Sequence, residues 1–92
     1  MGGPDIGLVN QHLHNVRVLA NKALDGIDVR KDLVSVVDGA CKQFLLAGPD
    51  PMANLAHFTG QLRLQADTTH DSQPAYKATL LRAVELCPPE IK

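Results

Sequence analysis

Apolar residues recur at helical spacing in the first part of the chain. The steps between them alternate between three and four residues, which places them on one face of a helix. Asp5 can cap the start of this helix with its carboxylate, and Gly26 can end it in a left-handed conformation. The pattern predicts a helix over residues 5–24. Its apolar positions are Ile6, Val9, Leu13, Val16, Ala20 and Ala23, with Leu19 and Leu24 beside them.

The second stretch contains the run "LVSVV", which by itself would suit a β-strand. Apolar positions nevertheless keep the helical period across residues 28–47, with Asp28 suited to the cap and Gly48 to the end. We therefore expect a second helix over this range. Its main stripe consists of Val29, Leu33, Val36, Ala40, Phe44 and Ala47, flanked by Val37, Cys41 and Leu45.

The segment "AGPDP", residues 47–51, both ends the second helix and begins the third. Gly48 can adopt a positive φ, and Pro49 cannot continue a helix. Asp50 offers its side chain as an N-cap, and Pro51 at the first helical position lacks only an N–H that would be unbonded in any case. A connection this short makes the two helices neighbours in an antiparallel hairpin.

Two further helices are expected, over residues 51–66 and 73–87, separated by the polar loop "DTTHDSQ". Ser72 or Gln73 can cap the last helix, with Pro74 in its first turn. Four amphipathic helices joined by short loops predict one all-α domain over residues 1–92, an antiparallel up-down four-helix bundle. The apolar positions are Met52, Leu55, Phe58 or Thr59, Leu62 and Ala66 in the third helix, and Tyr76, Leu80, Ala83 and Cys87 in the fourth, which Leu81 and Val84 flank and Pro88 and Pro89 end.

Charge and composition narrow the function. Nine basic and ten acidic residues give a net charge of −1, and they are spread along the chain, which argues against a nucleic-acid-binding protein. Apolar residues make up 45% of the chain, yet no run approaches the roughly 20 residues of a membrane span. No secretory signal is visible. We expect a soluble, cytoplasmic protein.

The histidines and cysteines do not form a metal-binding pattern. His12 and His14 lie two positions apart on a helix and point in different directions, so we expect both at the rim or in solvent. His57 lies beside the apolar stripe. Cys41 and Cys87 should each pack as a small apolar residue, and a disulfide between them stays open. The chain is therefore expected to bind no metal or other cofactor.

The sequence also contains no recognisable catalytic motif. There is no glycine-rich phosphate loop, no nucleophile elbow and no serine set near a histidine and an acid. The segment "DTTHDS" is typical of a solvated turn, and an enzyme using it would depend on His70. We interpret the chain as a non-enzyme without a small-molecule substrate.

A partner-binding surface is the remaining candidate. Some apolar residues lie off the helical stripes: Val18, Val34, Leu46, Leu64, Leu86 and Ile91. Arginine next to an exposed leucine is common at protein interfaces. The outer face of the last two helices and the tail therefore provide the predicted partner-binding residues, which are Arg63, Leu64, Arg82, Leu86, Ile91 and Lys92.

Four segments carry a family resemblance: "NKALDGIDVRKDL", "ACKQFLLAGPDP", "MANLAHFTGQLRLQADTT" and "PAYKATLLRAVEL". Together they resemble the immunity proteins of pediocin-like bacteriocins, the enterocin A immunity type, over about residues 18–86. The resemblance implies a cytosolic four-helix bundle that protects a bacteriocin producer. It would associate from inside with the mannose phosphotransferase permease and its bound bacteriocin. Unlike the often lysine-rich family members, this chain is nearly neutral.

A generic helical adaptor or a homo-oligomerising module is the alternative. Heptad spacing in the first helix would suit such an assembly.

Overall fold

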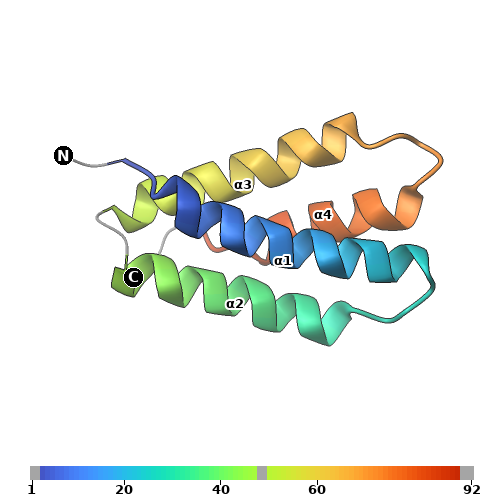
Figure 1. The fold of residues 1–92 in the computed structure, drawn as a ribbon, viewed down its shortest axis with the longest axis horizontal. Helices are drawn as coiled ribbons and strands as arrows, with labels where there is room; N and C mark the ends of the chain where they lie inside the picture. Colours follow the sequence, from blue (N-terminus) through green and yellow to red (C-terminus); the bar gives the residue numbers. More distant parts are fainter. Residues whose placement is uncertain (1–2, 48–49, 90–92) are drawn as a thin grey trace.

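The computed structural model describes residues 3–47 and 50–89, and four helices account for most of this part of the chain. They are α1 (Ile6–Leu24), α2 (Arg30–Ala47), α3 (Pro51–Thr68) and α4 (Pro74–Leu86). The described residues contain no strand. Successive helices run in opposite directions and pack side by side along one long axis (Figure 1). The predicted antiparallel four-helix bundle is confirmed.

Three of the expected helix ends have the expected chemistry. The carboxylate of Asp5 accepts from the Leu8 N–H at 3.2 Å, and that of Asp50 accepts from the Ala53 N–H at 3.1 Å. Gly26 has a φ of 82°, in the region that favours glycine. The predicted roles of Gly48 and Pro49 lie outside the described residues.

Other helix ends differ from the prediction by one or two residues. α2 begins at Arg30: the Asp28 carboxylate accepts from the Arg30 N–H at 3.1 Å, and the Val29 carbonyl accepts from the Leu33 N–H at 2.8 Å, so Asp28 lies one residue before the cap position. α3 continues to Thr68, whose hydroxyl donates to the Leu64 carbonyl at 3.0 Å. The expected side-chain cap of α4 is wrong: Gln73 at the cap position makes no capping hydrogen bond, and the Ser72 hydroxyl lies 2.8 Å from His70 Nδ1 instead.

The core follows the predicted stripes along most of each helix. Phe44 and Phe58 are fully buried, and their rings meet edge to face with centroids 5.5 Å apart. The stripes fail near helix ends, where Ile6, Leu24 and Met52 remain 47%, 38% and 44% exposed. The buried apolar residues are Val9, Leu13, Val16, Leu19, Ala20, Val29, Leu33, Val37, Ala40, Phe44, Leu55, Phe58, Leu62, Ala66, Leu80 and Ala83.

His12 is buried, which corrects the expectation of a rim or solvent position. Its side chain is 9% exposed, and its ring meets the Phe44 ring edge to face with centroids 5.5 Å apart. The position lies three residues after Val9 and four before Val16, so it belongs to the buried face of α1. Burial lowers the pKa of His12, and its Nε2 has no hydrogen-bond partner among the described residues. His14 is exposed, as expected.

Asn54 joins the beginnings of α1 and α3. Its side chain is fully buried, and its Oδ1 accepts from the Asp5 N–H at 2.6 Å. The Nδ2 of Asn54 is buried without a partner in the part of the chain described here. The amide thus fixes the entry of α1 against α3 while leaving one donor unpaired.

α4 is much shorter than its neighbours. It has 13 residues, against 19 in α1 and 18 in α2 and α3, so it is about 8 Å shorter than α2 or α3. It packs against all three other helices but ends before it reaches the end of the bundle where α1 and α3 begin and α2 terminates (Figure 1). We call this the open end.

Removing the buried aromatic contact should strongly destabilise the bundle. Phe44→Ala leaves a cavity between α1, α2 and α3, and we expect the free energy of unfolding to fall by about 3–5 kcal/mol. Urea unfolding followed by circular dichroism measures this change. Leu46→Ala, on the same helix but 83% exposed, is the matched control and should change stability by less than about 0.5 kcal/mol. Equal effects of the two substitutions would contradict the packing described.

Stability should fall as the pH drops below about 6.5 because of His12. Above this pH, His12 is neutral in both the folded and unfolded states. Below it, the unfolded chain binds a proton that the buried imidazole, with its lowered pKa, does not yet bind. The free energy of unfolding therefore decreases by at most about 1.4 kcal/mol per pH unit until the folded-state pKa is passed.

The variant His12→Phe should lose this part of the pH dependence, whereas His14→Gln should keep it. Urea unfolding at a series of pH values between 5 and 8 compares the three proteins. Asp28 does not interfere, since hydrogen bonds from Arg30 lower its pKa to about 2. An unchanged slope in His12→Phe would show that His12 is not the responsible group.

Candidate binding site at the open end of the bundle

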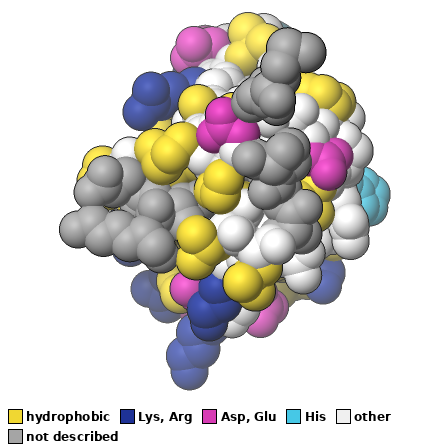
Figure 2. All heavy atoms as spheres, turned by 90° about the vertical axis from the view of Figure 1, so that its left-hand side faces the viewer, with side chains coloured by type: hydrophobic (Ala, Val, Ile, Leu, Met, Phe, Trp, Pro, Cys, Tyr) yellow, Lys and Arg dark blue, Asp and Glu magenta, His cyan; other side chains and the backbone are white. Residues whose placement is uncertain are grey.

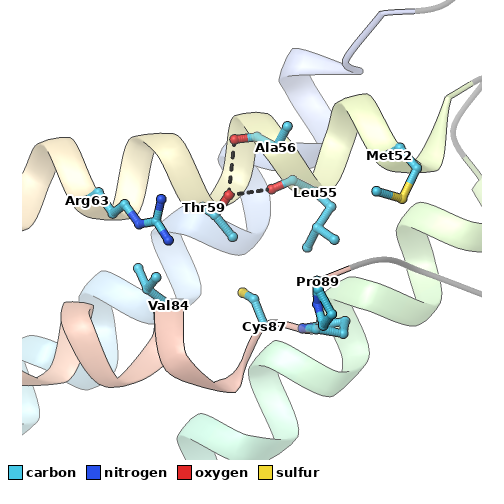
Figure 3. A pocket seen from close by; sticks show the side chains of 9 residues that line it. Met52, Leu55, Ala56, Thr59, Arg63, Val84, Cys87 and Pro89 are labelled. Carbon is cyan, nitrogen blue, oxygen red and sulfur yellow. Dashed lines mark hydrogen bonds between the residues drawn. The ribbon is translucent and has the colours of Figure 1, made fainter.

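A cavity of about 390 Å³ lies between α3 and the end of α4. Most of its lining is apolar, and Figure 3 shows how the side chains are arranged. Arg63 and Val84 lie toward one end, Met52 and Pro89 toward the other, with Thr59, Leu55 and Cys87 between them. The lining consists of Met52, Leu55, Ala56, Thr59, Arg63, Val84, Cys87, Pro88 and Pro89.

Two of the polar side chains in this cavity are already hydrogen-bonded to backbone. The Thr59 hydroxyl lies within hydrogen-bond distance of the Leu55 and Ala56 carbonyls, at 3.0 and 3.2 Å. The Cys87 thiol donates to the Ala83 carbonyl at 3.3 Å. Arg63 is different, because it forms no ion pair or hydrogen bond with any residue that the structure describes. The described lining of this cavity is therefore mostly apolar, with one cation, Arg63, that has no partner among the described residues.

A second cavity, of about 300 Å³, lies on the other side of α4. It is formed between α2 and the end of α4, and it shares Pro88 with the first cavity. Asp38, the charged residue among the described residues of this lining, is paired with Lys42 at 2.9 Å. The charge in this cavity is thus already balanced. Its lining consists of Val34, Val37, Asp38, Cys41, Leu86 and Pro88.

The two cysteines are free thiols, one in each cavity. Both are half-buried and pack against the core, in agreement with the prediction that each acts as a small apolar residue. Burial raises the pKa of Cys87 to about 12, with a further rise from Cys41 and a small opposing effect of Arg63. Burial and Asp38 also raise the pKa of Cys41. Both thiols are protonated at neutral pH, so neither is an activated nucleophile.

Apolar side chains are exposed at the open end itself. Ile6 is 47% exposed, Leu45 43%, Leu46 83% and Met52 44%. They come from the start of α1, the end of α2 and the start of α3, which the fold brings to the same end (Figure 1). Figure 2 looks onto this end and shows several hydrophobic side chains exposed on it, among polar and charged ones. We call these four residues the apolar end face.

The predicted partner-binding residues do not form one patch. Arg63 lines the first cavity, whereas Leu86 lines the second. Leu64 is 54% exposed on α3, and Arg82 is exposed and paired with Glu85 at 3.0 Å. Ile91 and Lys92 lie outside the described residues. A role of these residues in partner binding stays a prediction.

Leu86 is not the exposed residue that the sequence suggested. It is half-buried and packs against the core. Because α4 contacts α1, α2 and α3, its buried face is wider than a single stripe. Leu86 therefore faces α2, away from the outer face of α3.

The remaining histidines are spread over α3 and the following loop. His57 is half-buried, and His70 is exposed with its Nδ1 2.8 Å from the Ser72 hydroxyl. Within residues 3–47 and 50–89, no three His, Cys, Asp or Glu side chains come together as metal ligands. None of the helices, as far as they are described, combines the length and apolar character needed to cross a membrane.

Sequence reasoning missed both cavities and the apolar end face as a unit. The signal was present only in part: Pro88 after Cys87 indicates that the last helix stops early, and Leu46 lies off its stripe. The missing information is the relative position of the helix ends.

Compared with known proteins, the chain matches no family model, no curated protein and no solved structure.

Proposed function

We propose that this chain is a helical binding module that engages a partner protein through the apolar end face. The observation that carries this proposal is Leu46, which is 83% exposed at the end of α2. Burying apolar surface is worth about 25 cal/mol per Å², so a side chain in this position gains most when a partner covers it. Ile6, Leu45 and Met52 extend the same face.

The construction of the bundle supports binding at this end. Three helix termini converge there, and beneath them Phe44 and Phe58 are fully buried. A surface of exposed apolar residues on a well-packed base loses little conformational freedom when it docks. The apolar end face would serve to recognise the partner, and this function needs no chemical step.

The specific form of the proposal is the immunity function that the family resemblance implies. The partner would then be a membrane receptor complex, the mannose phosphotransferase permease with bound pediocin-like bacteriocin, approached from the cytosolic side. Support comes from the segments quoted above and from the all-helical bundle, the fold that the resemblance leads one to expect. A near-neutral chain would bind such a complex through apolar contacts more than through attraction to anionic lipid.

Expression of this chain in a sensitive lactic acid bacterium should raise its tolerance to at least one pediocin-like bacteriocin. The measurement is the minimum inhibitory concentration against a panel of such peptides, with an empty-vector strain as control. We expect a higher inhibitory concentration than in the empty-vector strain for the cognate peptide. No increase with any peptide, despite soluble expression, would contradict the immunity function and leave the binding surface to be tested separately.

The double variant Leu45→Ser/Leu46→Ser should lose partner binding while staying folded. Both side chains are exposed, so we expect a stability change below about 1 kcal/mol. Ile27→Ser is the matched control, because Ile27 is 51% exposed but lies between α1 and α2, at the opposite end of the bundle.

Two measurements test how these variants affect partner binding. The first is the protection assay. The second is light scattering after size exclusion, which tests the alternative that the face joins two copies of this chain. A dimer that Leu45→Ser/Leu46→Ser dissociates and Ile27→Ser does not would make a second copy the partner. A double variant that behaves like the native chain in both assays would contradict the proposal.

A further inference from the structure

We propose that the cavity between α3 and α4 binds a linear alkyl carboxylate, a medium-chain fatty acid, with its carboxylate at Arg63 and its chain directed toward Met52 and Pro89. This inference goes beyond partner binding, since it concerns a small molecule and does not depend on the apolar end face.

The shape of the cavity favours an extended ligand. Along α3 its lining follows one helical face at Met52, Leu55, Ala56, Thr59 and Arg63. The twelve residues from the first to the last of these span about 16 Å of helix, because eleven rises of about 1.5 Å separate them. Val84, Cys87 and the two prolines line the opposite side. A volume of about 390 Å³ lies at the lower end of the range typical of small-molecule sites.

The charge in the cavity favours a single anionic group at one end. Among the described residues of the lining, Arg63 is the one that carries a charge, and it has no partner among the described side chains. Its side chain extends from α3 toward the side occupied by Val84 (Figure 3). A guanidinium binds a carboxylate with two parallel hydrogen bonds, a geometry that matches this ligand class. The second cavity lacks this feature because Asp38 is already paired with Lys42.

The hydrogen-bond state of the lining favours an alkyl chain over a peptide. Thr59 and Cys87 already use their polar hydrogens within the chain. The site is open to solvent on the side of Ala56 and Arg63, but an extended peptide would also place amide groups against its apolar lining, where they find few partners, which is costly. An alkyl chain carries no such groups, so only its carboxylate needs a partner.

Decanoate is a suitable ligand for a titration of the whole chain. Decanol, which has the same alkyl tail and no charge, is the control ligand. We expect a titration followed by amide chemical shifts to move the signals of Leu55, Thr59, Arg63 and Val84. Arg63→Gln should weaken decanoate binding by about tenfold or more and should change decanol binding by less than about twofold. Arg82→Gln is the matched control, since Arg82 is an exposed arginine outside the cavity.

Three results would overturn the inference. The first is the absence of shifts at the cavity residues up to about 1 mM decanoate. The second is equal weakening by Arg63→Gln and Arg82→Gln, which would indicate general charge attraction. The third is tighter binding of an apolar peptide with a free carboxyl terminus than of decanoate in the same cavity. Circular dichroism of Arg63→Gln verifies that the variant is folded, and Leu45→Ser/Leu46→Ser should bind decanoate like the native chain.

Discussion

The early end of α4 is the constraint on which the rest of the structure depends. A residue before proline avoids the helical region, and Cys87 before Pro88 has a ψ of 133°, so α4 stops at Leu86. Its three neighbours continue beyond this point without a fourth helix to pack against. The two cavities lie on either side of the chain that follows α4, and they share Pro88. The backbone preference of the residue before Pro88 thus leads to both cavities and to the exposed ends of the other helices.

Large side chains fill the core next to the open end. Phe44 contacts both His12 and Phe58 edge to face, which connects α1, α2 and α3 just below the point where α4 is absent. Asn54 adds a hydrogen bond to the backbone of Asp5. This region has a cost, because His12 Nε2 and Asn54 Nδ2 are buried without partners in the described structure. The core next to the open end is therefore well packed, although it contains two buried polar atoms without described partners.

The sequence predicted the helices well because their signals are local. Asp5 and Asp50 cap as expected, and Gly26 has the positive φ that its position requires. Relations between helices were predicted poorly. Leu86 was expected in solvent and packs against the core, because the width of a buried face depends on how many helices surround it. His12 could have been placed from its spacing to Val9 and Val16, but the prediction considered only its spacing to His14.

The candidate site was beyond sequence reasoning for a similar reason. Arg63 was singled out because it adjoins an apolar residue, Leu64, yet its significance comes from α4, which places Val84 and Cys87 across from it. The apolar end face combines residues from three helix ends that are far apart in the sequence. Met52 belongs to both this face and the cavity. A ligand tail that reaches Met52 and a partner that covers it would contact the same side chain. By thermodynamic linkage, each would then change the affinity of the other by the same factor.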